Sequence, residues 1–283
     1  YRNGHAELLP NEWGEFMTPS CVGVLEDGTV TVGTVAKERL ITHPEETAAS
    51  FKTWMGTQKE YILGGRRFLP QELSALVLRK LAQSAREALG EEIEEAIISV
   101  PAYFNDNQRC ATRLAAQLAG LPVKRLINEP SAAALYYSQS RAQSECRLLV
   151  IDFGGGTLDR GCMLACEIGP ELYSVPLDSH ILSEICQPVF QKVREVIVRA
   201  VRDSEIPISA IQDVVLVGGS SQLGVFVDYL EELFSRRPTL AEHPEHTVAL
   251  GVGMYAGIKQ RDEDLREIVM TDVCPFSLGV ASY

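Results

Sequence analysis

The chain of 283 residues has a formal net charge of −12, from 26 basic and 38 acidic side chains, and 46% of its residues are hydrophobic. These totals are typical of a globular protein with one large domain or two lobes. The negative charge argues against general binding to nucleic acid and against adhesion to an anionic membrane. No apolar run approaches the roughly 18 residues of a membrane-spanning helix.

Seven cysteines are spread along the chain without a CxxC pair. An odd number without such spacing indicates reduced thiols rather than a disulfide framework, and it predicts a cytoplasmic protein. Cys162 and Cys166, with His180 downstream, lack the fourth ligand of a zinc site, so structural cysteines are the simpler interpretation. The first ten residues show neither the basic nor the apolar region of a signal peptide.

The first predicted element is a β-hairpin within residues 21–33, because Asp27-Gly28 lies between two β-rich segments. Apolar residues at helical spacing follow over residues 71–89. Gly90 is suited to the position just after the helix end.

Residues 95–100 have the composition of a short buried strand, which Pro101 ends. A helix is expected over residues 105–120, because Asn105 can cap its first turn and Gln108 completes a capping box. The remaining predicted elements are strands at 123–128, 148–152 and 213–219, and helices from Pro130, at 224–234 and at 247–260. Strands that alternate with helices predict an α/β fold with buried, partly parallel sheets.

Two of these strands end in glycine-rich loops, at residues 150–156 and 217–221. Glycines let backbone amides approach a phosphate without a Cβ in the way, and bare N–H groups attract anions. Asp152 adds a hard oxygen ligand suited to magnesium, and Thr157 adds a hydroxyl. Glycines after a strand also occur in ordinary turns, but two such loops favour a nucleotide site. The chain lacks GxxxxGK[ST] and a GxGxxG that opens a helix, which argues against P-loop and Rossmann sites.

The chain closely resembles the ATPase domain of seventy-kilodalton heat-shock chaperones in three segments: ISVPAYFNDNQRCATRLAAQLAGLPVKRLINEPSAAALYY, IDFGGGTLD and VLVGGSSQL. The resemblance implies the actin-like, ribonuclease H-like ATPase fold, in which two lobes enclose a nucleotide cleft. Other segments, such as LLPNEWGEFMTPS, look most like the bacterial HscC branch of that family.

The resemblance implies ATP or ADP with Mg²⁺ as ligands. Lys52 matches the lysine that reaches the γ-phosphate and the attacking water, although by itself it would be an ordinary surface lysine. Glu129 matches a carboxylate that orders magnesium-bound water; taken alone, it is an acid favoured at a helix N-terminus. Asp152 matches an acid near the metal, again through water, and is a candidate proton acceptor.

Further residues match nucleotide-contacting positions of the family. They are Gly154, Gly155, Gly156 and Thr157 in the second phosphate loop, Gly218, Gly219, Ser220 and Gln222 near the nucleoside, and Glu167 as a remnant of a nucleoside-contacting glutamate. Pro101 and Arg109 match a switch pair that relays the nucleotide state to the interdomain linker, whereas Pro101 alone would be a strand terminator.

The chain departs from the family pattern at several places. The first phosphate loop, a DLGTTNS-like turn, is absent, and residues 160–212 are fewer than the family has between its two glycine loops. Gln222 stands where many relatives have an arginine that stacks on adenine, and Glu245 replaces a more usual aspartate. We expect that segments of a longer natural chain are omitted, with joins near residues 160–161 and 167–168. An intact mass equal to the 31.1 kDa of this sequence would contradict that expectation.

We predict ATPase lobe I over residues 1–143, lobe II over 144–265, and over 266–283 an interdomain linker with the start of a substrate-binding domain. The expected activity is slow hydrolysis of Mg·ATP, which controls peptide binding by a C-terminal domain in a bacterial cytoplasmic stress response. The expected partners are a J-domain cochaperone, unfolded peptide clients and a nucleotide-exchange factor. Two alternatives keep the fold: a catalytically impaired scaffold, or a small-molecule kinase of the actin and sugar-kinase superfamily.

Overall fold

The computed structural model describes residues 1–2, 4–139, 147–153, 162–168, 171–177 and 179–259, with the backbone alone at 139, 162–168, 171–177 and 179. These residues belong to two compact units, Tyr1–Glu129 with Val252–Tyr283, and Pro130–Gly251. Both units combine helices with small sheets, so the predicted α/β composition is confirmed. The predicted boundaries at residues 143 and 265 stay predictions.

The first unit opens with an antiparallel sheet of order β2-β1-β3, formed by Cys21–Val24 (β1), Val30–Val32 (β2) and Thr47–Ala49 (β3). The predicted hairpin is confirmed, since β1 pairs with β2. In its turn the Thr29 amide donates to Asp27 Oδ1 at 2.9 Å. Helix α1 (Thr34–Thr42), which contacts this sheet, was not predicted, because it has little amphipathic character.

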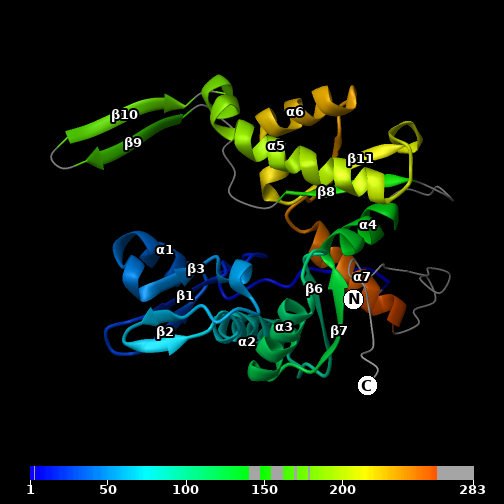
Figure 1. Ribbon diagram of the computed structural model, residues 1–283. Helices are drawn as coiled ribbons and strands as arrows, with labels where there is room; N and C mark the ends of the chain where they lie inside the picture. Colours follow the sequence, from blue (N-terminus) through cyan, green and yellow to red (C-terminus); the bar gives the residue numbers. More distant parts are fainter. Residues whose placement is uncertain (3, 140–146, 154–161, 169–170, 178, 260–283) are drawn as a thin grey trace, which may run out of the picture. The chain divides into compact units, whose positions relative to one another are not determined.

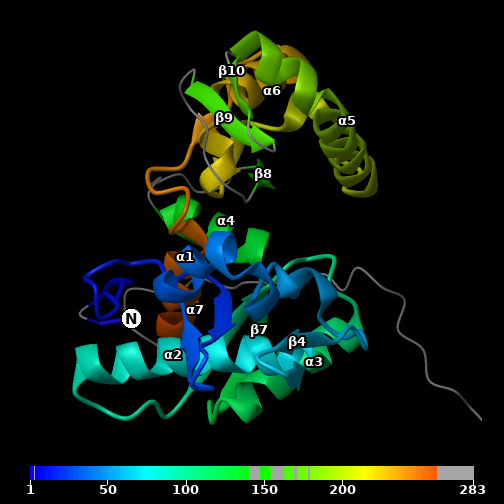
Figure 2. The same cartoon turned by 90° about the vertical axis from the view of Figure 1, so that its left-hand side faces the viewer.

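Two helices and two further strand pairs complete the first unit. Its elements are β4 (Tyr61–Leu63) antiparallel to β5 (Arg66–Phe68), α2 (Pro70–Leu89), β6 (Ala96–Val100) parallel to β7 (Val123–Asn128), and α3 (Asp106–Leu118). Figures 1 and 2 show α2 and α3 side by side. The predicted capping box of α3 is present: the Gln108 amide donates to Asn105 Oδ1 at 3.0 Å, and Gln108 Oε1 accepts from the Asn105 amide at 2.9 Å.

Helix α2 separates two apolar clusters because its buried residues point in two directions. Leu73 and Val77 pack with β1 and β3 residues such as Val22, whereas Ala75 and Ala82 pack with the alanines of α3. The small α3 residues Ala111, Ala115 and Ala116 let the two helices approach closely.

The second unit is built on a parallel sheet of order β12-β11-β8, formed by Leu148–Asp152 (β8), Asp213–Val217 (β11) and Thr239–Leu240 (β12). Helices α5 (Ser179–Asp203) and α6 (Gly224–Phe234) cover one face. Helix α4 (Glu129–Gln139) packs on the other face, as Figure 1 shows. Cys162–Ile168 (β9) and Glu171–Leu177 (β10) form an antiparallel hairpin. Neither this hairpin nor α5 was predicted.

Helix α7 (Thr247–Lys259) runs from the second unit into the first. Its small residues allow close packing at Gly253 and Gly257, which lie against Ala6 and Tyr1. The tightest approach is one that the sequence did not indicate. A Cβ on Gly251 would lie 1.8 Å from the carbonyl oxygen of Ala132 on α4, so only glycine fits there. Within the described residues, none of the helices combines the length and apolarity that crossing a membrane requires.

Phe226 is the centre of the aromatic core of the second unit. It is fully buried, and its ring lies 4.3 Å from Phe153 and 5.7 Å from Phe190. We predict that Phe226→Ala lowers the free energy of unfolding by about 3–5 kcal/mol in urea denaturation, because it removes both contacts and leaves a cavity. Val196→Ala, at a position that is 66% exposed on α5, is the control and should change it by less than about 0.5 kcal/mol. Equal effects would contradict this assignment.

The N-terminal segment is held on α2 by a hydrogen-bonded carboxylate. Lys80 Nζ lies 2.6 Å from Glu12 Oε1, and Ser84 Oγ donates to Oε2 at 3.4 Å. The hydrogen bond from Lys80 lowers the pKa of Glu12 below its ordinary value. A lowered pKa in the folded state stabilises the protein above the unfolded pKa, and this contribution is lost as the pH falls through the folded value.

We therefore predict that Glu12→Gln is less stable than the parent protein at pH 7, and that the difference shrinks as the pH falls below the ordinary pKa of a glutamate and disappears only below the lowered pKa of Glu12. Lys80→Met should raise the pKa of Glu12, measured by NMR titration of its carboxyl carbon. A Glu12 pKa that does not respond to Lys80→Met would contradict this interpretation.

Candidate functional site

Two candidate catalytic residues from distant parts of the sequence form an ion pair in the first unit. Lys52 Nζ donates to Glu129 Oε1 at 2.7 Å. The Lys52 side chain is 56% exposed and that of Glu129 is 16% exposed, so the lysine can reach a ligand while the carboxylate is largely enclosed. Glu129 directly follows β7 and is the first residue of α4, where its negative charge is favoured by the helix dipole.

Lys52 lies in a 3₁₀ turn, Phe51–Trp54, that is held at both ends by buried side chains. Phe51 and Met55 are only 2% and 3% exposed. The turn is entered through Ser50, whose φ of 55° is unusual for a residue other than glycine. The Thr53 hydroxyl donates to the Ser50 carbonyl at 2.8 Å. The backbone of Lys52 is thus well defined, although its side chain is half exposed.

The predicted switch residues lie on either side of one loop, with Pro101 at its start and Arg109 in the first turn of α3. Arg109 Nε donates to the Phe104 carbonyl at 2.8 Å, and Nη2 donates to the Ala102 carbonyl at 3.2 Å. The same Nη2 donates to Asn128 Oδ1 at 2.7 Å. Pro101 is buried at the start of this loop. Arg109 therefore joins the loop after Pro101 to the residue that precedes Glu129.

Asn128 was not recognised from the sequence. It is 8% exposed and ends β7, parallel to the strand that ends at Val100. Polar side chains at the carboxyl ends of neighbouring parallel strands are often functional, and this was the signal that could have identified it.

In the second unit, Asp152 and Gly218 are brought together by the pairing of β8 with β11. Asp152 is paired with Val217 at the carboxyl end of the sheet and is exposed. Gly218 has a φ of 88°, and a Cβ there would lie 2.6 Å from the Phe153 carbonyl oxygen and 2.8 Å from Asp152 Oδ1. Glycine is required at this position both for its backbone conformation and for the space it leaves.

The loop after Gly218 is a short 3₁₀ helix, Gly219–Gln222, with Ser220 buried and Gly219 partly buried. The Gly218 amide donates to the Pro244 carbonyl at 2.8 Å. The Gln222 side-chain amide donates to Glu245 Oε2 at 3.3 Å. Gln222 and Glu245, the two residues expected to depart from the family pattern, are therefore hydrogen-bond partners.

Several predicted positions have no described side chain. Gly154, Gly155, Gly156 and Thr157 lie outside the described residues. Glu167 is described by its backbone, paired with Leu172 in the β9–β10 hairpin. In the part of the chain with described side chains, no group of three or more His, Cys, Asp or Glu residues could hold a metal ion by itself.

These groups are suited to phosphate and magnesium chemistry. Lys52 offers a mobile cation, and Asp152 is an exposed carboxylate of the kind that holds hydrated magnesium. The backbone of Gly218 lies so close to Asp152 that a Cβ would be 2.8 Å from its Oδ1.

A comparison with known families agrees with this chemistry. The family model described as Hsp70 protein matches the chain in three overlapping stretches, residues 1–64, 58–170 and 165–283. Together the stretches span all 283 residues. Successive stretches overlap at residues 58–64 and 165–170, and the join expected near residues 167–168 stays a prediction.

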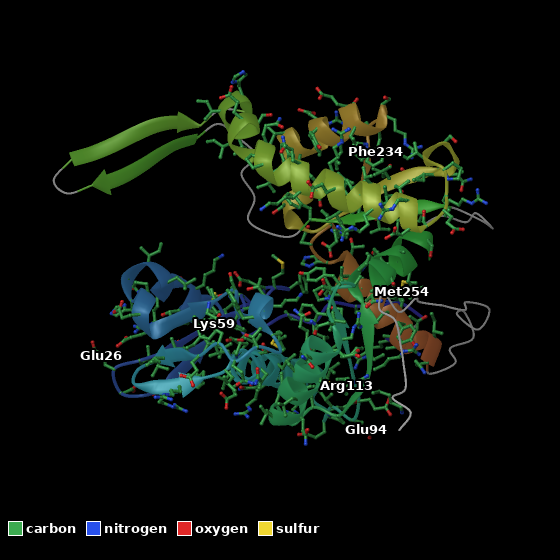
Figure 3. The ribbon with its side chains drawn as sticks, viewed as in Figure 1. Glu26, Lys59, Glu94, Arg113, Phe234 and Met254 are labelled. Atoms are coloured by element: carbon green, nitrogen blue, oxygen red, sulfur yellow. The ribbon has the colours of Figure 1, made fainter. Side chains whose placement is uncertain are left out.

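We predict that Arg109→Ala lowers the free energy of unfolding by about 2–3 kcal/mol, because three acceptors lose a charged donor. Arg113, one turn later on α3, is exposed (Figure 3) and is the matched control. Arg113→Ala should change the free energy by less than about 0.5 kcal/mol in the same urea titration. Similar losses for the two variants would show that the Arg109 hydrogen bonds contribute little.

Proposed function

The chain belongs to the Hsp70 family, whose members are ATPases and chaperones, and on that premise we propose that it binds and slowly hydrolyses Mg·ATP. The observation that carries the proposal is the ion pair between Lys52 and Glu129 at 2.7 Å. A half-exposed cation beside a largely enclosed carboxylate supports the two roles that we propose for these residues. The actin-like arrangement of two lobes around one nucleotide is part of this proposal.

In the first unit, Lys52 is the group that would bind the γ-phosphate and orient the attacking water. A cation in this role stabilises the charge that develops as the phosphoryl group is transferred. Glu129 holds the ammonium group of Lys52 through a charge-assisted hydrogen bond. We assign Glu129 the further task of ordering water in the first coordination sphere of the metal.

In the second unit, Asp152 is the proposed proton acceptor, and the loop Gly218–Gln222 is the proposed nucleoside site. Asp152 is exposed, as a group that accepts a proton from water must be. Gly154, Gly155, Gly156 and Thr157, with Glu167, are proposed as further contacts from the resemblance alone. Mg²⁺, held through water by Asp152 and Glu129, would supply neutralisation of the phosphate charge.

The remaining parts of the proposal rest on family membership. We propose that Pro101 and Arg109 relay the nucleotide state to a linker in residues 266–283 and from there to a peptide-binding domain. We also propose a J-domain cochaperone, unfolded peptide clients and a nucleotide-exchange factor as partners. Membership of the HscC branch, a bacterial cytoplasmic location and a role in the stress response complete the proposal.

One observation favours a second function, that of a scaffold which binds nucleotide weakly. Gln222 has no cation to stack on adenine, and its amide is engaged by Glu245 at 3.3 Å. A cation over an aromatic ring contributes about 0.5–2 kcal/mol, so its loss weakens binding of the base. The scaffold would use the same fold without turnover.

We predict that calorimetry detects binding of Mg·ATP and that Lys52→Ala retains binding while single-turnover hydrolysis falls about a hundredfold. Lys59 is the matched control, because it is also exposed (Figure 3) and its Nζ lies 4.1 Å from the Trp54 ring centroid. Lys59→Ala should hydrolyse ATP at the parent rate. Absence of binding by the parent chain would favour the scaffold, and release of ADP that depends on a sugar would favour a kinase.

A further inference from the structure

We propose that Gly56 is a positioning residue that holds the Lys52 turn against the first turn of α3 and so sets Lys52 beside Glu129. The juxtaposition is between the backbone of Gly56 and the backbone of Asn107 and Gln108. The catalytic part of this inference rests on the proposed ATPase function, whereas the positional part does not.

The contact at Gly56 leaves no room for a side chain. A Cβ there would lie 2.8 Å from the Asn107 carbonyl carbon, 2.9 Å from its oxygen and 2.9 Å from the Gln108 nitrogen. Contacts this short force a displacement, because every atom concerned belongs to the backbone rather than to a flexible side chain. Gly56 also has a φ of 74°, in the left-handed region that favours glycine.

Helix α3 is the more rigid of the two partners in this contact. Its first turn is closed by the reciprocal hydrogen bonds between Asn105 and Gln108. Over the next two turns, Ala111, Ala115 and Ala116 are buried against α2 and the first-unit core. A side chain at position 56 would therefore displace the turn that carries Lys52 rather than the helix.

A displacement at Gly56 is transmitted to Lys52 through a short hydrogen-bonded turn. The Met55 amide donates to the Lys52 carbonyl at 3.3 Å, and the Thr57 amide donates to the Trp54 carbonyl at 3.1 Å. The buried Met55 side chain is held by the Ser74 hydroxyl, 3.2 Å from its sulfur. Lys52 and Gly56 thus lie in one short segment whose backbone is connected by hydrogen bonds.

The same end of α3 also sets the position of Glu129. Arg109 follows Gln108 and donates to Asn128 Oδ1 at 2.7 Å, one residue before Glu129. The first turn of α3 therefore helps to fix the positions of both charged residues. It contacts the Lys52 turn through Gly56, and it is connected to the residue before Glu129 through Arg109. A small shift at position 56 changes the distance between the two charged groups.

The test compares Gly56→Ala with Gly65→Ala in the whole chain. Gly65 has a φ of 72°, but a Cβ there meets nothing within 4 Å, so the control carries the same backbone penalty without the contact. We expect single-turnover hydrolysis of Mg·ATP to fall at least about tenfold in Gly56→Ala, because the lysine is misplaced. The KM should change by less than about twofold, since binding groups are retained. Gly65→Ala should match the parent in both.

A nucleotide-free readout separates this inference from the proposed function. The chain has two tryptophans, Trp13 and Trp54, so in a Trp13→Phe background the emission reports the Lys52 turn. We expect the Trp54 emission maximum to shift in Gly56→Ala and not in Gly65→Ala. A parent chain without hydrolysis would overturn the proposed ATPase, while the emission shift would still support the position assigned to Gly56.

A second variant distinguishes the steric contact from the backbone conformation. Asparagine tolerates a left-handed φ but has a Cβ, so Gly56→Asn should be as defective as Gly56→Ala. Parent-like emission and rate in either variant would overturn the inference. Loss of folding in both variants, with Gly65→Ala folded, would assign Gly56 a purely structural role and would overturn it as well.

Discussion

The first turn of α3 is the constraint on which the candidate residues of the first unit depend. Its capping box makes this helix end rigid. Gly56 contacts it by backbone, and Arg109 extends from it to Asn128. Lys52 is half exposed, and it pairs with a glutamate 77 residues away in the sequence. Surface ion pairs contribute little stability by themselves, so without the contacts to α3 the geometry of this pair would be loosely defined.

The candidate residues of the second unit depend on a different constraint, the parallel register of β8 with β11. Pairing of Asp152 with Val217 brings two chain segments to the same end of the sheet. There the Asp152 carboxylate lies against Gly218, where any Cβ would clash. Parallel strands buried on both faces support such a site well, since α4, α5 and α6 cover the sheet and leave its carboxyl end for function.

Two of the departures expected from the family resemblance are also connected by their side chains. Gln222 and Glu245 would each be unremarkable alone, yet they share a hydrogen bond, and Glu245 Oε1 lies 3.6 Å from His246 Nε2. The family resemblance implies a cation near the base at this position, whereas here a carboxylate lies beside a neutral amide. In the proposed function, the expected divergence lies on the nucleoside side, whereas Lys52, Glu129 and Asp152 are assigned to the phosphate side.

The sequence alone determined many of the local elements and the family of the protein. The capping box of α3 and the Asp27-Gly28 hairpin depend on neighbouring residues, so they could be predicted, and specific sequence motifs indicated the family. It could not indicate α1, whose face is weakly amphipathic, or the contacts of Gly56, Gly251 and Asn128. Those contacts join segments distant in the chain, and only the packing of helices and strands decides which backbone atoms meet there.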